Sequence, residues 1–210
     1  LSDWDRHMAQ VIFLPGCNFR CPFCHNAGIV RGAGEPFAWP DIAAAMERHR
    51  GWVRASVITG GEPTLHDGLL PLCRWLKKCG HLVKLDTNGA KPGHLRTLIA
   101  EQVLDYVAMD IKTGWTRYPL ATGGVDAAVA VRESFVILRD SGLPFELRTT
   151  VVPGLLNRND LDELIPTLTG VPHWHLQAYQ PAPTLDPAWS DLTPPLVAEL
   201  AALADHLNRH

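Results

Sequence analysis

Three cysteines stand within eight residues of one another, at Cys17, Cys21 and Cys24, and His25 follows directly. Thiolates at the spacing C-x3-C-x2-C can share one short loop and hold a metal ion or an iron–sulfur cluster. A [4Fe–4S] cluster with four cysteine ligands is usually an electron carrier, whereas three ligands leave one iron free for chemistry. The missing fourth cysteine therefore indicates a cluster that binds a substrate.

Two other kinds of site use similar residues, and the cysteines alone leave both open. A zinc ion could take the three thiolates and His25, although adjacent residues such as Cys24 and His25 are awkward ligands for one tetrahedral ion. The segment from Cys21 to His25 also matches C-x-x-C-H, the pattern of covalent c-type haem attachment, but that reading leaves Cys17 without a role. Either alternative would make the chain a binding module without catalysis.

Polar motifs follow several apolar runs of the chain. They are Gly60-Gly61-Glu62-Pro63, Asp86-Thr87-Asn88-Gly89, Asp110-Ile111-Lys112, and the single residue Arg148. Glycine permits close approach of backbone, carboxylate and carbonyl oxygens accept from ammonium groups, and Lys or Arg bind carboxylates. Alone, the first motif would be an ordinary turn and Asp110 with Lys112 a surface ion pair of little worth. As a set at the ends of successive strands, they are instead expected to meet at one rim of the fold and form a common site.

The elements that must position these motifs alternate between strands and helices. Strands are predicted at Val11–Leu14, Ser56–Thr59, Leu82–Asp86, Tyr106–Asp110, Phe145–Val152 and His173–Ala178. Helices are predicted at Trp39–Arg50, Leu69–Cys79, Gly93–Glu101, Asp126–Ser141, Leu161–Leu168 and Pro194–Asn208. Pro194 is expected in the first turn of the last helix, and Gly80 and Gly142 are expected to end helices.

Such alternation predicts an α/β fold with parallel strands. A complete eight-unit barrel needs about 250 residues, so six units in 210 residues predict a partial (β/α)6 barrel with outer helices. We expect one domain spanning residues 1–210. In parallel folds the chemistry sits at the carboxyl ends of the strands, which is where the motifs fall.

Composition excludes several classes of protein. Hydrophobic residues make up 46% and charged residues 20%, and the net charge is -3, which predicts a packed globular protein without an electrostatic footprint for nucleic acid. No apolar run approaches the roughly 18 residues of a membrane span, so we expect no membrane partner. The odd set of five cysteines predicts a metal site in the reducing cytoplasm rather than disulfides, with Cys73 and Cys79 as packing or surface thiols.

The cysteine loop resembles that of the radical S-adenosylmethionine (SAM) superfamily, whose motif C-x3-C-x-aromatic-C is matched by Cys17, Cys21, Phe23 and Cys24. The resemblance implies that the three cysteines bind a [4Fe–4S] cluster and that SAM chelates the fourth iron. One electron from the cluster then cleaves SAM to methionine and a 5′-deoxyadenosyl radical. It also implies that Phe23 lies beside the adenine of SAM.

By the same resemblance, Gly60, Gly61 and Glu62 belong to the GGEP segment that receives the SAM ammonium group. The later motifs narrow the resemblance to activating enzymes of glycyl radical proteins, through Leu85-Asp86-Thr87-Asn88-Gly89 and Met109-Asp110-Ile111-Lys112.

This second resemblance implies that Asp86, Thr87 and Asp110 help to place SAM, with a monovalent cation near Asp86 and Asp110. Lys112 and Arg148 would bind the carboxylate of SAM.

The subgroup that the chain resembles most is the anaerobic ribonucleoside-triphosphate reductase activating proteins. The resemblance implies two partners, a glycyl radical enzyme as protein substrate and flavodoxin or ferredoxin as electron donor. A radical SAM enzyme that acts on a small molecule, in the synthesis of a modified nucleobase or cofactor, is the alternative that the motifs leave open.

Overall fold

The computed structural model describes residues 3–209, and its centre is one six-stranded parallel sheet. Neighbouring strands pair in chain order, from β1 to β6, and each pair is parallel. The strands are β1 (Ala9–Leu14), β2 (Ala55–Gly60), β3 (Leu82–Thr87), β4 (Tyr106–Asp110), β5 (Phe145–Val151) and β6 (Trp174–Ala178). Because β1 and β6 do not pair, the sheet is the open, partial barrel that the sequence predicts.

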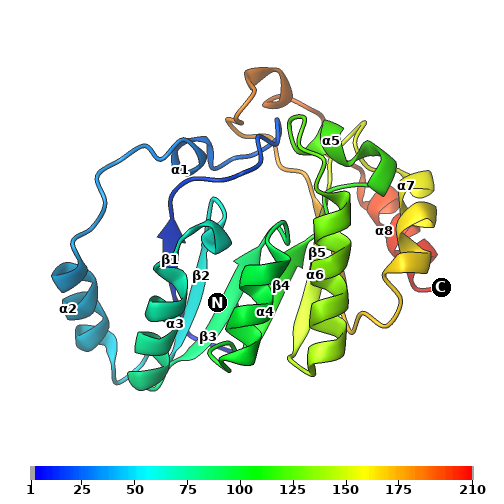
Figure 1. The fold of residues 1–210 in the computed structure, drawn as a ribbon. Helices are drawn as coiled ribbons and strands as arrows, with labels where there is room; N and C mark the ends of the chain where they lie inside the picture. Colours follow the sequence, from blue (N-terminus) through cyan, green and yellow to red (C-terminus); the bar gives the residue numbers. More distant parts are fainter. Residues whose placement is uncertain (1–2, 210) are drawn as a thin grey trace.

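Helices join the strands, and α3, α4 and α6 lie together on one face of the sheet (Figure 1). The helices are α1 (Ala27–Val30), α2 (Trp39–His49), α3 (Leu69–Lys78), α4 (Pro92–Ala100), α5 (Tyr118–Ala121), α6 (Ala128–Ser141), α7 (Arg158–Leu164) and α8 (Val197–Leu207). The loops after β1 and β6 arch over the carboxyl end of the sheet (Figure 1). Among the described residues, no helix is long and apolar enough to cross a membrane.

Alternation along the strands separates the core from the site. On β5 the side chains of Phe145, Leu147 and Val151 are buried in the core with the helices, while Arg148 and Thr150 line a cavity on the opposite face. This period of two is the geometry of a strand whose faces meet different environments. Strand β5 therefore buries these apolar side chains outward and presents Arg148 and Thr150 inward.

The amino end of the inner face is filled by the segment before β1. Trp4 is buried against Ala55 and Val57, and the buried Lys84 donates its Nζ to the carbonyl oxygen of Asp3 at 2.7 Å. The inner cavity therefore opens at the carboxyl end of the strands.

The predicted strands all exist, with ends within two residues of the observed ones. Gly142 has a φ of 73° and follows α6 as a left-handed cap, and Gly80 has a φ of 80° just beyond α3. These positions confirm the helix ends expected from glycine, which enters the left-handed region without a side-chain clash.

The predicted start of α7 at Leu161 is wrong by three residues. The helix begins at Arg158 because the side chain of Asn157 accepts from the backbone N–H of Asn159, while Asp160 accepts from the N–H of Asn157. This reciprocal capping is a strong start signal. The predicted end at Leu168 is partly replaced by a 3₁₀ turn at Ile165–Thr167.

Pro194 is not in the first turn of the last helix, as the sequence predicts. Helix α8 begins at Val197, and the carboxylate of Glu199 accepts from the backbone N–H of Leu196 at 2.7 Å. Pro195 explains the error, because the residue before a proline is disfavoured in the helical conformation. Pro194 therefore extends the chain rather than opening the helix.

The ends of β1 and β2 meet at two glycines that tolerate no side chain. The N–H of Gly61 donates to Leu14 at 2.9 Å, and the N–H of Glu62 donates to Gly16 at 2.8 Å. A Cβ on Gly61 would lie 1.9 Å from the carbonyl oxygen of Gly16. Gly60 has a φ of 128°, and a Cβ there would lie 2.2 Å from the carbonyl oxygen of Leu14. The double glycine is thus required by backbone contact between these two loops.

We predict that Gly61→Ala lowers the free energy of unfolding by about 1–3 kcal/mol, the usual cost of overpacking. Gly93→Ala is the matched control, because a Cβ there meets nothing within 4 Å and alanine in a helix is favoured over glycine by roughly 0.5–1 kcal/mol. Urea denaturation of both variants measures the difference. Equal stability of the two variants would contradict the backbone contact.

Candidate active site

The loop that carries the three cysteines follows β1 and is held from several directions. The N–H groups of Leu185 and Asp186, in the segment after β6, donate to the carbonyl oxygens of Cys24 and Pro22 at 2.8 and 3.0 Å. The N–H of Arg20 donates to Thr122 at 2.9 Å. Segments far apart in the sequence therefore fix the shape of the cysteine loop.

The thiols of this loop are partly or fully withdrawn from water. Cys21 is buried and Cys17 and Cys24 are half-buried. Burial raises the pKa of Cys17, and burial raises that of Cys21 to about 12 although the Lys112 ammonium group opposes the shift. The thiols of Cys17 and Cys21 therefore stay protonated at neutral pH until a metal displaces the protons.

A single metal ion does not fit the described residues. Among residues 3–209, no three His, Cys, Asp or Glu side chains converge closely enough to hold one ion. Zinc requires such convergence, whereas thiolates on an iron–sulfur cube each bind a different iron atom and stand further apart. The described residues therefore offer no ready site for one zinc ion.

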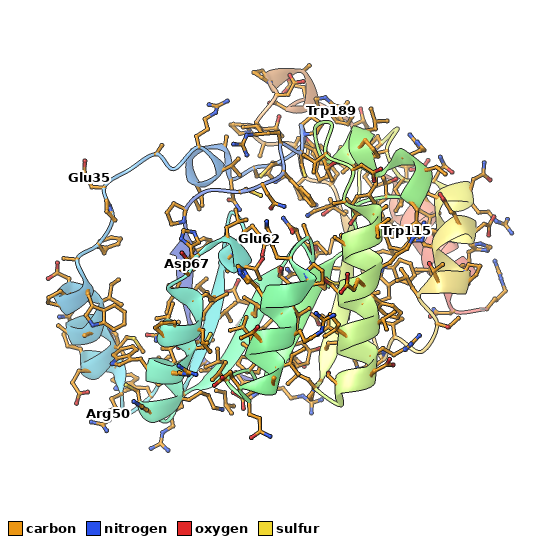
Figure 2. The ribbon with its side chains drawn as sticks, in the orientation of Figure 1. Glu35, Arg50, Glu62, Asp67, Trp115 and Trp189 are labelled. Atoms are coloured by element: carbon orange, nitrogen blue, oxygen red, sulfur yellow. The ribbon has the colours of Figure 1, made fainter. Side chains whose placement is uncertain are left out.

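Glu62 lies at the carboxyl end of the sheet beside the 3₁₀ turn Pro63–Leu65 (Figure 2). Its carboxylate is fully buried and accepts hydrogen bonds from the backbone and hydroxyl of Thr64, the hydroxyl of Thr87 at 2.7 Å and the N–H of Asn88 at 2.7 Å. Burial raises the pKa of Glu62 and these donors oppose the shift. The first role of this carboxylate is therefore to join the loop after β2 to the end of β3.

Four charged residues form a chain of ion pairs on the inner face of β3, β4 and β5. Arg148 contacts Asp86 and Asp110, each at 3.1 Å, and Lys112 contacts Asp110 at 2.8 Å. The pairing of Asp110 with Arg148 in the β4–β5 register places the two side chains opposite each other. The sheet thus presents two cations and two carboxylates as one array.

The charges of this array are mutually stabilised. Burial would raise the pKa of Asp110, but Lys112 and Arg148 outweigh it and the pKa is lowered. Burial acts against the charge of Lys112 and of Arg148, yet the facing carboxylates raise both of these pKa values. All three groups therefore remain charged at neutral pH.

Asp86 differs from Asp110, because one of its carboxylate oxygens accepts no hydrogen bond. Burial raises the pKa of Asp86 in spite of Arg148 and Lys84. Its Oδ1 is buried and accepts no hydrogen bond, and the Nζ of Lys84 forms an ion pair with it at 3.8 Å. A buried acceptor without a donor is costly. The residues therefore fit a ligand that brings a hydroxyl or ammonium donor to this point.

One cavity of about 340 Å³ brings the candidate residues together. Its lining contains every residue that the sequence predicts for the site: Cys17, Phe23, Cys21, Cys24, Gly60, Gly61, Glu62, Asp86, Thr87, Asp110, Lys112 and Arg148. Lys112 and Arg148 both form ion pairs with the carboxylate of Asp110. The cavity therefore combines metal-binding thiols with a charged array for a zwitterion.

Sequence reasoning missed other lining residues, among them Asn88, Thr150 and Gln177. Thr150 follows Arg148 by two residues on β5, so the alternation of the strand could have indicated it. Gln177 lies on β6, whereas Gln180, two residues beyond the end of that strand, does not line the cavity. The position of β6 beside β5 decides which glutamine faces inward.

The fold and the site define a class of protein: a partial barrel with three cysteines and a charged array at the carboxyl ends of its strands. Comparison with known proteins agrees with this class. The family model described as the radical SAM superfamily matches residues 11–166. The chain belongs to that superfamily. Members use an iron–sulfur cluster and SAM, and the cysteines, the Asp86 oxygen that accepts no hydrogen bond and the charged array fit these two groups.

Two relatives carry names that concern glycyl radicals. A Methanocaldococcus jannaschii protein named, provisionally, as a glycyl-radical enzyme activating enzyme is 30% identical over 96% of this chain and 85% of its own. The pyruvate formate-lyase-activating enzyme of Streptococcus mutans is 29% identical over 80% of this chain and 70% of its own.

A solved structure shares the fold. Streptococcus suis SuiB bound to S-adenosylmethionine superposes with a TM-score of 0.70 and 14% identity, over 96% of this chain. This chain spans 47% of the length of SuiB. At this identity the likeness shows the fold alone.

The monovalent cation expected near Asp86 and Asp110 stays a prediction. The guanidinium group of Arg148 contacts both carboxylates. The protein's own arginine thus supplies a positive charge at this position.

We predict that Arg148→Met lowers the free energy of unfolding by about 3 kcal/mol, near the lower end of the cost of breaking a buried ion pair. Asp110 keeps Lys112 as a partner, whereas Asp86 is left without its nearest cation. Adding Asp86→Asn to the same chain should recover part of the loss.

The control is Arg96→Met, because the pair of Arg96 and Glu133 is solvent-exposed and such pairs contribute at most about 1 kcal/mol. Urea denaturation at neutral pH compares the variants. If Arg148→Met and Arg96→Met cost the same, the array does not stabilise the sheet.

Proposed function

We propose that this protein generates a glycyl radical on a partner enzyme. When bound, the reduced cluster supplies one electron that cleaves SAM to methionine and a 5′-deoxyadenosyl radical, and this radical takes a hydrogen atom from a glycine Cα. The products are 5′-deoxyadenosine and a partner that holds the radical. The observation that supports this most is the single cavity in which three thiols face the charged array.

Each predicted residue has a proposed role in that cavity. Cys17, Cys21 and Cys24 bind three irons, and Phe23 packs beside the adenine. The backbone at Gly60 and Gly61 accepts from the SAM ammonium group, with Glu62 beneath it.

The charged array serves the rest of SAM. Lys112 and Arg148 donate to its carboxylate through charge-assisted hydrogen bonds. Asp86, through its free Oδ1, accepts from a hydroxyl group, while Thr87 and Asp110 hold the neighbouring groups in place.

The names of two relatives support a protein substrate over a second small molecule, because both names concern the activation of another enzyme.

The partner that we propose first is anaerobic ribonucleoside-triphosphate reductase, on the motifs around Asp86 and Asp110. The names of the relatives mention glycyl-radical enzymes and pyruvate formate-lyase and do not single out the reductase. An external flavodoxin or ferredoxin would provide the electron. We also propose that residues 1–210 form one domain, since one large hydrophobic cluster includes buried residues of the sheet and of the helices that cover it, and that the protein works in the cytoplasm.

Cleavage of SAM tests the chemistry. We expect the anaerobically reconstituted protein to bind about four irons and, with dithionite and SAM, to form 5′-deoxyadenosine. Cys21→Ala should reduce iron content and lower product to background, because one cluster ligand is lost. Cys79→Ala is the control, since Cys79 caps α3 away from the cavity. Full activity of Cys21→Ala would refute the assignment.

Electron paramagnetic resonance tests the partner. The reduced protein is mixed with SAM and, separately, with anaerobic ribonucleotide reductase and pyruvate formate-lyase. We expect a glycyl radical doublet on the reductase, and the doublet should disappear when its radical glycine is replaced by alanine. SAM cleavage without a doublet on either enzyme would replace the protein substrate by a small molecule.

A further inference from the structure

Asn88 occupies a junction between the loops that carry the three motifs. Its backbone N–H donates to Glu62 at 2.7 Å, which ties it to the loop after β2. Its side-chain Nδ2 donates to the Oδ1 of Asn18 at 2.9 Å and lies 3.9 Å from the Sγ of Cys17. Asn88 is only 5% exposed, so water does not compete strongly for these contacts.

The orientation of the Asn88 amide is determined by a separate hydrogen bond. Its Oδ1 accepts from the N–H of Ala90 at 2.9 Å, as in the turns that asparagine and aspartate commonly form. Because the oxygen is engaged there, the NH₂ group must be the end that points to the cysteine loop. The turn needs only a side-chain oxygen, which aspartate would also supply. It therefore does not explain why this residue carries an amide nitrogen.

Cys17 differs from the other two cysteines because N–H groups donate hydrogen bonds to its sulfur. Its Sγ receives the backbone N–H of Phe19 at 3.4 Å as well as the Nδ2 of Asn88. For Cys21 and Cys24, no N–H donor to the sulfur is present within residues 3–209. Hydrogen bonds to ligand sulfurs withdraw charge and make a cluster easier to reduce.

We propose that Asn88 is a positioning residue that fixes the cysteine loop against the SAM-binding loops and raises the reduction potential of the cluster through Cys17. Electron supply to the cluster and the shape of the SAM site are thereby set by one side chain. The inference depends on the cluster that the family uses and is independent of which substrate the radical attacks.

Two variants separate the amide donor from the turn. Asn88→Asp keeps an oxygen for the N–H of Ala90 and the backbone bond to Glu62, but it replaces the donor by a negative charge. Asn88→Ser also supports a turn, carries no charge and is too short to reach Cys17. The matched control is Asn159→Asp, which makes the same charge change at an exposed position on α7.

The readout is the midpoint potential of the reconstituted cluster, measured by redox titration with electron paramagnetic resonance and without any substrate. We expect both Asn88 variants to shift the potential to more negative values, Asn88→Asp further than Asn88→Ser, and Asn159→Asp to leave it unchanged. Iron content and urea denaturation of the apoprotein accompany each titration.

An unchanged potential in Asn88 variants with full iron content would overturn the proposal, and a fall in apoprotein stability with no change in potential would assign Asn88 a structural role only. If Asn88→Asp loses its cluster while the apoprotein remains folded, the result supports the role of Asn88 in positioning the cysteine loop. The midpoint potential of Asn88→Ser then decides whether Asn88 also raises the reduction potential of the cluster. Failure of both variants to fold would likewise overturn the proposal. None of these results depends on the formation of a glycyl radical.

Discussion

The buried carboxylate of Glu62 is the interaction on which the carboxyl end of this sheet depends. It accepts from Thr64, Thr87 and Asn88, and so it joins the loop after β2 to the end of β3. A carboxylate with no exposure is stable only when its oxygens are fully hydrogen-bonded. The same loop touches the end of β1 through Gly61, so three adjacent strands converge on one rigid rim.

The ion pairs on the inner face likewise join the ends of adjacent strands, here β3, β4 and β5. A buried charge is costly unless it is paired, and here Arg148 serves two carboxylates while Lys112 shares one of them. The arrangement leaves one oxygen of Asp86 without a donor. Such a leftover acceptor in a cavity beside three thiols is a cost to stability that a bound ligand would remove.

Much of the site could be predicted because short motifs carry it. Cys17, Cys21 and Cys24 share a loop, and Asp110 and Lys112 share a strand end, so local sequence reports their proximity. The two mispredictions have different causes. Pro194 is not a helix start because Pro195 directly after it disfavours helical backbone at that residue. Gln177 faces the cavity only because β6 pairs with β5, a contact that is absent from the local pattern.

The sequence by itself determined the strand and helix alternation, the cysteine spacing and the residue types of the zwitterion array. Those properties follow from periodicity and from side-chain chemistry, which are local. Only the tertiary structure decided that Glu62 is enclosed by donors, that Arg148 links Asp86 to Asp110, and that the amide of Asn88 faces Cys17. These contacts join residues from different strand ends, so they exist only once the parallel sheet has brought its carboxyl ends to a common rim.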